Sequence, residues 1–222
     1  MAFGLSKCTS QNAPPEEYLE DEFKEEEKDN PATHLPDQQN QSRDAWQSPL
    51  TVISLYGDIQ DKVIADIGSG SGYFSFRMAY MGAKVLALDI DREALKSIED
   101  QKDELRLRNE TFGNNIYTRV VAENDAKLKE NEVDHVLIVN TFPFINNRVD
   151  YLKRLIKAIK PGGTILIADF KMKKLPPEVA PPLDERLPLY VVEQELEQAG
   201  FKLLKSDDAS LDFLYMVQAM VE

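Results

Sequence analysis

The feature that most constrains the fold of this chain is a regular alternation between short apolar runs and longer segments of helical periodicity. Short apolar runs of this kind are typical of buried strands, and apolar residues three or four positions apart are typical of helices. The predicted strands are 63–67, 84–89, 115–121, 133–139 and 164–168, and the predicted helices are 73–81, 90–105, 149–159 and 192–199. Such alternation predicts right-handed crossovers and a parallel sheet covered by helices on both faces.

The C-terminal part departs from this alternation. Segments 201–205 and 211–220 are both strand-like, and only a short polar turn separates them, so they are expected to pair antiparallel. The predicted fold class is therefore α/β: a doubly wound, mostly parallel, seven-stranded sheet with a C-terminal antiparallel hairpin. Residues 43–56 are predicted to form a helix that leads into the domain. Residues 175–188 hold five of the twelve prolines and predict a non-helical loop at the carboxyl edge of the sheet.

The net charge of −13 is spread unevenly over the 222 residues. Residues 1–45 hold four basic and eleven acidic side chains, whereas residues 46–222 hold 22 and 28, so more than half of the net charge falls in the first fifth of the chain. The apolar residues of this first part are few and scattered, which is too little to offset the entropy of folding. We therefore predict an acidic, disordered tail over 1–41 and one folded domain over 42–222.

Composition excludes several classes of protein. A strongly acidic chain repels phosphate backbones, so nucleic acid is not expected as a partner. A single cysteine, Cys8, excludes an intramolecular disulfide and a cysteine-based zinc site, and no metal site is predicted. No apolar run has the ~18 residues that a membrane helix needs. The expected location is cytoplasmic, with a lipid anchor on Cys8 as the alternative if a signal peptide has been truncated.

The turn after the first strand carries the main chemical signal. It reads Asp66-Ile67-Gly68-Ser69-Gly70-Ser71-Gly72, a glycine-rich turn whose backbone can approach a ligand closely. The second strand ends in Asp89, where a carboxylate can accept hydrogen bonds from both hydroxyls of a ribose. Because Asp66 would repel a pyrophosphate but attract an ammonium group, this pattern favours S-adenosylmethionine over NAD.

These residues resemble the class I S-adenosylmethionine-dependent methyltransferases, and among them the bacterial small-molecule methyltransferases of the type 11 and type 25 groups. Residues 63–74 resemble the glycine-rich first motif of that family and residues 86–90 its acidic second motif. The segments 43–47, 160–164 and 196–201 are also typical, and the resemblance covers about residues 43–220. It implies a Rossmann-like methyltransferase fold, S-adenosyl-L-methionine as cofactor, and methyl transfer to a small-molecule or lipid-like acceptor.

The resemblance also implies a role for individual residues. Asp66 is expected near the methionine ammonium, the glycine-rich turn around the methionine part, Asp89 at the ribose and Ile90 against the adenine. One of the three residues after the third strand is expected to meet the adenine amino group, and Asn140 is expected beside the sulfonium. The full set of expected cofactor-binding residues is Asp66, Gly68, Ser69, Gly70, Gly72, Asp89, Ile90, Glu123, Asn124, Asp125 and Asn140.

Several alternatives remain open at the level of sequence. Asp66 could instead hold the turn, and Asn140 could cap the turn after the fourth strand. Thr141 and Phe142 stand where amino-group methyltransferases carry two prolines, and no side chain is identified as a general base, so catalytic residues stay unassigned. The alternative functions are a protein or RNA methyltransferase, for which 153–160 offers a basic helical stripe, and a non-catalytic S-adenosylmethionine-binding protein.

Overall fold

The computed structural model describes residues 41–222, with side chains from residue 43 onward. The predictions made for the acidic tail, including the alternative of a lipid anchor on Cys8, lie outside the described residues. The boundary expected between tail and domain therefore stays a prediction. Within the described residues, no helix is long and apolar enough to span a bilayer.

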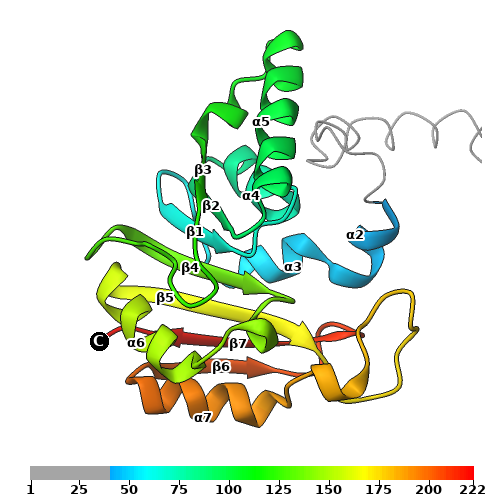
Figure 1. Ribbon diagram of the computed structural model, residues 1–222, viewed down its shortest axis with the longest axis vertical. Helices are drawn as coiled ribbons and strands as arrows, with labels where there is room; N and C mark the ends of the chain where they lie inside the picture. The colour runs from blue at the N-terminus through cyan, green and yellow to red at the C-terminus, as the bar shows by residue number, and fades with distance from the viewer. Residues whose placement is uncertain (1–40) are drawn as a thin grey trace, which may run out of the picture. The chain divides into compact units, whose positions relative to one another are not determined.

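One mixed sheet forms the centre of the described structure. Its strands are β1 (Val63–Ile67), β2 (Lys84–Asp89), β3 (Ile116–Val120), β4 (Val133–Val139), β5 (Ile159–Phe170), β6 (Lys202–Asp207) and β7 (Leu214–Met220). They lie in the order β3-β2-β1-β4-β5-β7-β6, which can be followed from top to bottom in Figure 1. Strands β1 to β5 pair in parallel, and β7 pairs antiparallel with both β5 and β6. The predicted fold class is confirmed.

Helices cover both faces of this sheet. The helices are α2 (Gln41–Gln47), α3 (Pro49–Ser54), α4 (Tyr73–Tyr80), α5 (Arg92–Leu107), α6 (Arg148–Ala158) and α7 (Leu189–Ala199). Apolar side chains of α3, α4 and α5 pack on one face in one buried cluster. Those of α6 and α7 pack on the opposite face in a second cluster. This double covering explains why β1 and β4 are apolar at nearly every position, since neither face of a central strand meets water.

The helix predicted over 43–56 is wrong as a single element, because the chain forms α2 and α3 with a break at Ser48. Ser48 has a φ of 44°, and Pro49 is the first residue of α3. Proline disfavours a helical conformation in the residue before it and tolerates the start of a helix, so a helix ends before Ser48 and a new one begins after it. Just before the break, the Trp46 ring stacks on Phe170 at 5.7 Å between ring centroids.

The start of β5 also differs from the prediction, which placed Pro161-Gly162-Gly163 between a helix and a strand that begins at residue 164. In the structure β5 begins at Ile159 and includes all three residues. The Gly162 N–H donates to the Val221 carbonyl at 2.9 Å, and the Val221 N–H donates to the Gly163 carbonyl at 3.0 Å. A side chain at Gly163 would lie 2.3 Å from the carbonyl oxygen of Asp134, so glycine allows the close strand pairing here.

Three single-turn 3₁₀ segments complete the elements of residues 41–222: η4 (Phe112–Asn115), η5 (Phe142–Phe144) and η6 (Leu183–Glu185). The segment η6 is a correction, since the proline-rich loop 175–188 was expected to be free of helix. Buried Arg186 holds this loop, because its guanidinium donates to the carbonyl oxygens of Pro181, Lys171 and Lys173. These hydrogen bonds hold the loop in one conformation beside the carboxyl end of β5.

Candidate functional site

A cavity of about 220 Å³ opens at the carboxyl edge of the sheet. The chain order reverses between β1 and β4, and in open α/β sheets the crevice at such a reversal is where ligands bind. Loops that follow β1, β2, β3 and β4 all contribute to the lining, which consists of Ile67, Gly68, Asp89, Ile90, Val121, Ala122, Glu123, Thr141, Phe144, Ile145 and Tyr151. The cavity is far larger than the ~30 Å³ that one water molecule occupies.

Gly68 fixes the shape of this cavity at the end of β1. Its φ is 74°, and a Cβ at this position would lie 2.2 Å from Oγ1 of Thr141. The Gly68 N–H donates to the Leu88 carbonyl at 2.8 Å, which joins the turn to β2. Only glycine combines this left-handed conformation with so close an approach to Thr141.

Asp89 lines the cavity at the end of β2. Its Oδ2 accepts the Gly70 N–H at 2.8 Å, and its Oδ1 accepts the Asp91 N–H at 2.9 Å. A carboxylate has about four lone-pair directions, so these two bonds leave acceptor capacity for a ligand. The Asp89 carboxylate thus fixes the glycine-rich turn and can also accept hydrogen bonds from a ligand in the cavity.

Asp66 does not line the cavity and is only 3% exposed. Its Oδ2 accepts the Ser75 hydroxyl at 2.6 Å. The pKa of Asp66 is raised to about 6, and burial is the main cause. The negative charge of Asp89 also raises this pKa, whereas the Ser75 hydrogen bond and the positive charge of Arg43 lower it. Arg43, which was not among the predicted site residues, thus acts from α2 on the acid that precedes the glycine-rich turn.

The three residues expected at the adenine amino group separate in the structure. Glu123 lines the cavity. The Asn124 carbonyl instead accepts a hydrogen bond from Arg154, and Asp125 lines a different, smaller cavity of about 20 Å³ beside Arg154. Of these three predicted residues, only Glu123 is brought to the main cavity, where it joins Gly68, Asp89 and Ile90.

The remaining predicted residues lie outside the cavity lining: Ser69, Gly70, Gly72 and Asn140, together with Asp66. Two of them carry buried polar atoms without a hydrogen-bond partner among residues 43–222, namely Oγ of Ser69 and Oδ1 of Asn140. Asn140 follows β4 with a φ of 52°, and its N–H donates to the Ala168 carbonyl at 2.9 Å. Buried polar atoms are normally paired, so these two atoms are available for a hydrogen bond with a ligand or with water.

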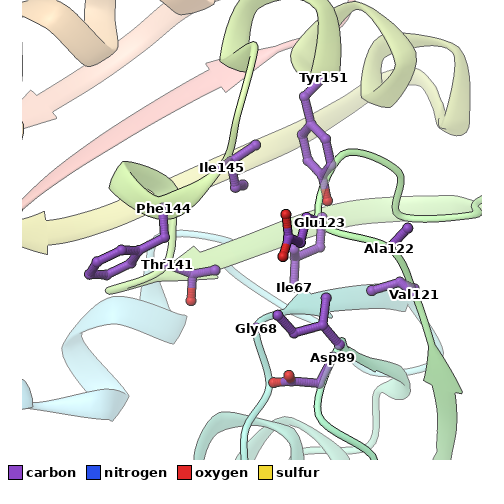
Figure 2. A pocket seen from close by; sticks show the side chains of 11 residues that line it. Ile67, Gly68, Asp89, Val121, Ala122, Glu123, Thr141, Phe144, Ile145 and Tyr151 are labelled. Atoms are coloured by element: carbon purple, nitrogen blue, oxygen red, sulfur yellow. The ribbon is translucent and has the colours of Figure 1, made fainter.

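One side of the cavity is formed by residues that were not among the expected cofactor-binding residues, namely Thr141, Phe144, Ile145 and Tyr151. Figure 2 shows Ile145 and Tyr151 across the cavity from Asp89. Their place in the sequence could have identified them, because the segment 141–145 comes shortly after a central strand, at the edge of the sheet where ligands bind. Phe144 is 59% exposed, whereas Phe142, two residues earlier, is fully buried.

A doubly wound sheet with a glycine-rich turn, an acid after β2 and a cavity at the chain reversal defines a Rossmann-like nucleoside-binding class of protein. Within that class, residues 59–205 match the family model described as "Methyltransferase domain". The chain therefore belongs to this family of methyltransferase domains, and its resemblance to the S-adenosylmethionine-dependent methyltransferases is confirmed.

Individual relatives agree with this assignment. Over 123 residues the chain is 28% identical to a ubiquinone biosynthesis O-methyltransferase of Hydrogenovibrio crunogenus, which corresponds to 54% of this chain and 48% of the relative. A ubiquinone/menaquinone biosynthesis C-methyltransferase of Wigglesworthia glossinidia brevipalpis is 27% identical over 113 residues, or 50% and 43% of the two chains. The chain thus spans about half the length of the curated relatives it matches.

A solved structure extends the likeness to the fold. The crystal structure of a SAM-dependent methyltransferase from Aquifex aeolicus superposes with a TM-score of 0.72 at 23% identity, and the match covers 88% of this chain and all of the other. At this identity the superposition concerns the fold alone.

Proposed function

We propose that this protein is an S-adenosylmethionine-dependent methyltransferase that acts on a small-molecule acceptor. The observation that carries the proposal is Asp89, a carboxylate at the end of β2 that lines the cavity at the chain reversal. A carboxylate in this position suits the two hydroxyls of a ribose. Glu123 in the same cavity makes the site unfavourable for phosphate and therefore for a dinucleotide.

The residues present fit this cofactor. The cradle at Gly68, which any Cβ would fill, allows the backbone to approach a ligand, and the unpartnered Oγ of buried Ser69 supplies a polar atom beside it. In our proposal Asp89 binds the ribose, Ile90 packs on the adenine, and Glu123 accepts a hydrogen bond from the adenine amino group. The turn from Gly68 to Gly72 would surround the methionine part, with Asp66 and Asn140 nearby.

When bound, S-adenosylmethionine supplies an activated methyl group for in-line transfer. The task of the chain is then to align the acceptor and to keep water away from it. Thr141 and Phe144 follow β4 at the cavity, and we propose that this end receives the acceptor. Two of the relatives are an O-methyltransferase and a C-methyltransferase of quinone biosynthesis, which supports a small hydroxylated ring as acceptor here.

Calorimetric titration tests the cofactor part of the proposal. We expect wild-type protein to bind S-adenosylhomocysteine and S-adenosylmethionine and not NAD. Asp89→Asn should weaken binding of the adenosyl ligands by at least about tenfold, since it removes the carboxylate that accepts hydrogen bonds from both ribose hydroxyls. Glu130→Ala, which removes an exposed acid away from the cavity, is the matched control and should bind as wild type. Tight binding of NAD, or equal affinities in wild type and Asp89→Asn, would contradict the proposal.

A labelled-methyl assay tests the acceptor part. Protein with methyl-labelled S-adenosylmethionine is incubated with catechol, with ethanolamine, and with a small-molecule cell extract, and the labelled products are separated. We expect label in hydroxylated aromatic products. Binding of the cofactor with no label transferred to any of the three would instead favour the non-catalytic binding protein.

The structure gives little support to a nucleic-acid acceptor. Of the basic stripe expected on one helix, Lys160 lies on β5 and pairs with Asp134 at 2.9 Å. Lys153 pairs with Asp150, and Arg154 donates to the Asn124 carbonyl. The stripe is thus divided between two elements, and these three cations already have partners in the chain.

A further inference from the structure

A second polar position lies at the carboxyl edge, outside the cavity described above. Asp169 is the penultimate residue of β5 and is 2% exposed. Its Oδ1 accepts the N–H of Phe170 at 2.8 Å. Its Oδ2 is buried and has no hydrogen-bond partner among residues 43–222. The family resemblance assigned no role to this residue.

The sheet places Asp169 beside Asn140. Strands β4 and β5 are parallel neighbours with Val139 opposite Ala168, so Asn140, the first residue after β4, lies beside Asp169 of β5. The Asn140 N–H also bonds to the Ala168 carbonyl at 2.9 Å. Oδ1 of Asn140 is likewise buried and unpartnered in the described part of the chain. Two adjacent strand ends therefore present one unpaired oxygen each.

The position of Asp169 in the strand shows which face it belongs to. Ala168 and Phe170 pack in the cluster on the face covered by α3, α4 and α5. Alternation along a strand then directs Asp169 to the face covered by α6 and α7, beside its cross-strand partner Tyr215. The Tyr215 hydroxyl donates to the Leu187 carbonyl at 3.0 Å, so it is not the donor that Oδ2 lacks.

Two arginines near the neighbouring residues Tyr215 and Phe170 also have partners within the chain. Arg148 of α6 pairs with Glu195 of α7 at 2.7 Å. Arg186 of the proline-rich loop donates to the backbone carbonyls named above. Burial raises the pKa of Asp169 to about 7, with the Phe170 N–H opposing this in part. A buried carboxyl group with a free oxygen lowers stability unless a ligand supplies the missing donor.

We propose that Asn140 and Asp169 form the acceptor subsite and bind a hydroxyl group of the methyl acceptor. The inference rests on the proposed function and deepens it. The subsite adjoins the nucleoside cavity, because Thr141, the residue after Asn140, lines that cavity. Oδ2 of Asp169 accepts the hydroxyl proton as a hydrogen bond, and Oδ1 of Asn140 accepts a second donor where the acceptor has one, as a catechol does.

The proposal accounts for the acceptor proton. As the acceptor oxygen forms its bond to the methyl carbon, the methyl–sulfur bond breaks and its electron pair stays on sulfur, so that S-adenosylhomocysteine is the leaving group. The acceptor O–H bond also breaks, and its proton moves to Oδ2 of Asp169. The carboxylate becomes a carboxylic acid, which later returns the proton to solvent.

The first test measures stability against pH in full-length protein. Asp169→Asn should unfold at a higher temperature than wild type at pH 8.5, by a few degrees, because it removes a buried unpaired charge. At pH 5, where Asp169 is protonated and neutral, the difference should shrink toward zero. Asp212→Asn changes an exposed acid in the same way and should show no such trend. A lower unfolding temperature for Asp169→Asn at pH 8.5 would overturn the proposal and give Asp169 a structural role.

The second test measures binding and turnover. In the presence of S-adenosylhomocysteine, catechol should bind wild type at least tenfold more tightly than 1,2-dimethoxybenzene, which lacks hydroxyl donors, and Asp169→Asn should lose this preference. Label transfer to catechol should fall by about 100-fold or more in the same variant. Equal behaviour of catechol in wild type and Asp169→Asn, including no binding to either, would overturn the subsite. Failure of wild type to bind S-adenosylhomocysteine would instead overturn the proposed function.

Discussion

At the scale of single residues, the glycine-rich turn contains a matched pair of positions. Gly68 and Gly70 both have positive φ values, 74° and 53°. A Cβ on Gly68 would collide with Thr141, whereas a Cβ on Gly70 would have no atom within 4 Å. A side chain at either position would therefore strain the left-handed backbone, but only a side chain at Gly68 would also collide with Thr141.

Substitution of both glycines separates these two costs. Gly70→Ala should lower the free energy of unfolding by about 1–2 kcal/mol, the cost of left-handed backbone for a residue with a Cβ. Gly68→Ala should lose a further amount of about 1–3 kcal/mol from overpacking. Chemical denaturation measures both values, and equal losses would contradict the collision. The Gly68→Ala, Thr141→Ser double variant, which keeps the hydroxyl, should recover little of the loss, since Oγ1 is the nearest atom.

Asp66 predicts a pH dependence of cofactor binding. Its pKa of about 6 lies above the ordinary value because of burial, so the group changes charge close to neutral pH. If its carboxylate attracts the methionine ammonium, binding favours the deprotonated form, and affinity falls as the pH drops through 6. Well below this pH the loss approaches about tenfold per pH unit, which is the limit for one linked proton. Calorimetry with S-adenosylhomocysteine between pH 5 and pH 8 measures this slope.

Two comparisons make this test specific. 5′-Methylthioadenosine keeps the adenosine and the thioether but has no ammonium, so its affinity should change little over the same pH range. Asp66→Asn should bind S-adenosylhomocysteine weakly and without the slope. The same slope for both ligands would mean that Asp66 acts only on the folded turn. In that case the stability of the free protein should still decrease as the pH rises through 6, because the raised pKa favours the protonated folded state.

At the scale of elements, α2 is tied to α4 through one acid. Asp44 of α2 accepts Nη2 of Arg77 at 2.6 Å and the Tyr73 hydroxyl. The Arg77 side chain is 6% exposed, so removal of Asp44 leaves a buried cation without its carboxylate. Trp46, the single tryptophan of the chain, lies two residues further along and stacks on Phe170.

Fluorescence can therefore report on the docking of α2. Asp44→Ala should shift the Trp46 emission to longer wavelength and lower the free energy of unfolding by about 2–3 kcal/mol, somewhat less than for a fully buried pair because Asp44 is 30% exposed. Asp100→Ala breaks the exposed Lys96–Asp100 pair on α5 and should leave both the stability and the emission wavelength nearly unchanged. An unshifted emission in Asp44→Ala would show that α2 is held by its apolar contacts alone.

The elements also show what a sequence can predict. Strands β1, β2 and β4 have the predicted bounds, because a strand buried on both faces reads as a continuous apolar run. The start of β5 could not be predicted in this way. Its Pro-Gly-Gly segment reads as a turn, and only the pairing with the distant Val221 makes it part of a strand. Tertiary contacts override local preference there.

The whole molecule limits the prediction of the site in the same way. Asp89 and Gly68 were predictable because their signal is local: an acid at the end of a strand and a glycine in a tight turn. Tyr151 reaches the cavity from α6, and Arg43 acts on Asp66 from α2. Such placements depend on how helices pack on the sheet, which no local pattern of residues contains. The same holds for Asp169, which became significant only through its unpaired oxygen.

The division of the chain into tail and domain yields the last prediction. Residues 1–40 contain three basic and ten acidic side chains, a net charge of −7 out of −13. The buried residues of the two apolar clusters lie between Val52 and Met216 in the first and between Ala65 and Val221 in the second. We therefore expect a variant that lacks residues 1–40 to unfold within about 1 °C of the full chain and to bind S-adenosylhomocysteine within about twofold.

Salt separates the two ways in which the tail could still act. If its negative charge opposes folding by long-range repulsion, the truncated variant should be slightly more stable than the full chain at 10 mM salt. That difference should vanish at about 300 mM, where exposed charges more than about 6 Å apart are largely screened from each other. Thermal unfolding and calorimetry at both salt concentrations measure these effects. A loss of stability or of ligand affinity that persists at high salt would mean that the tail makes direct contacts with the domain, and the predicted boundary at residue 41 would then be wrong.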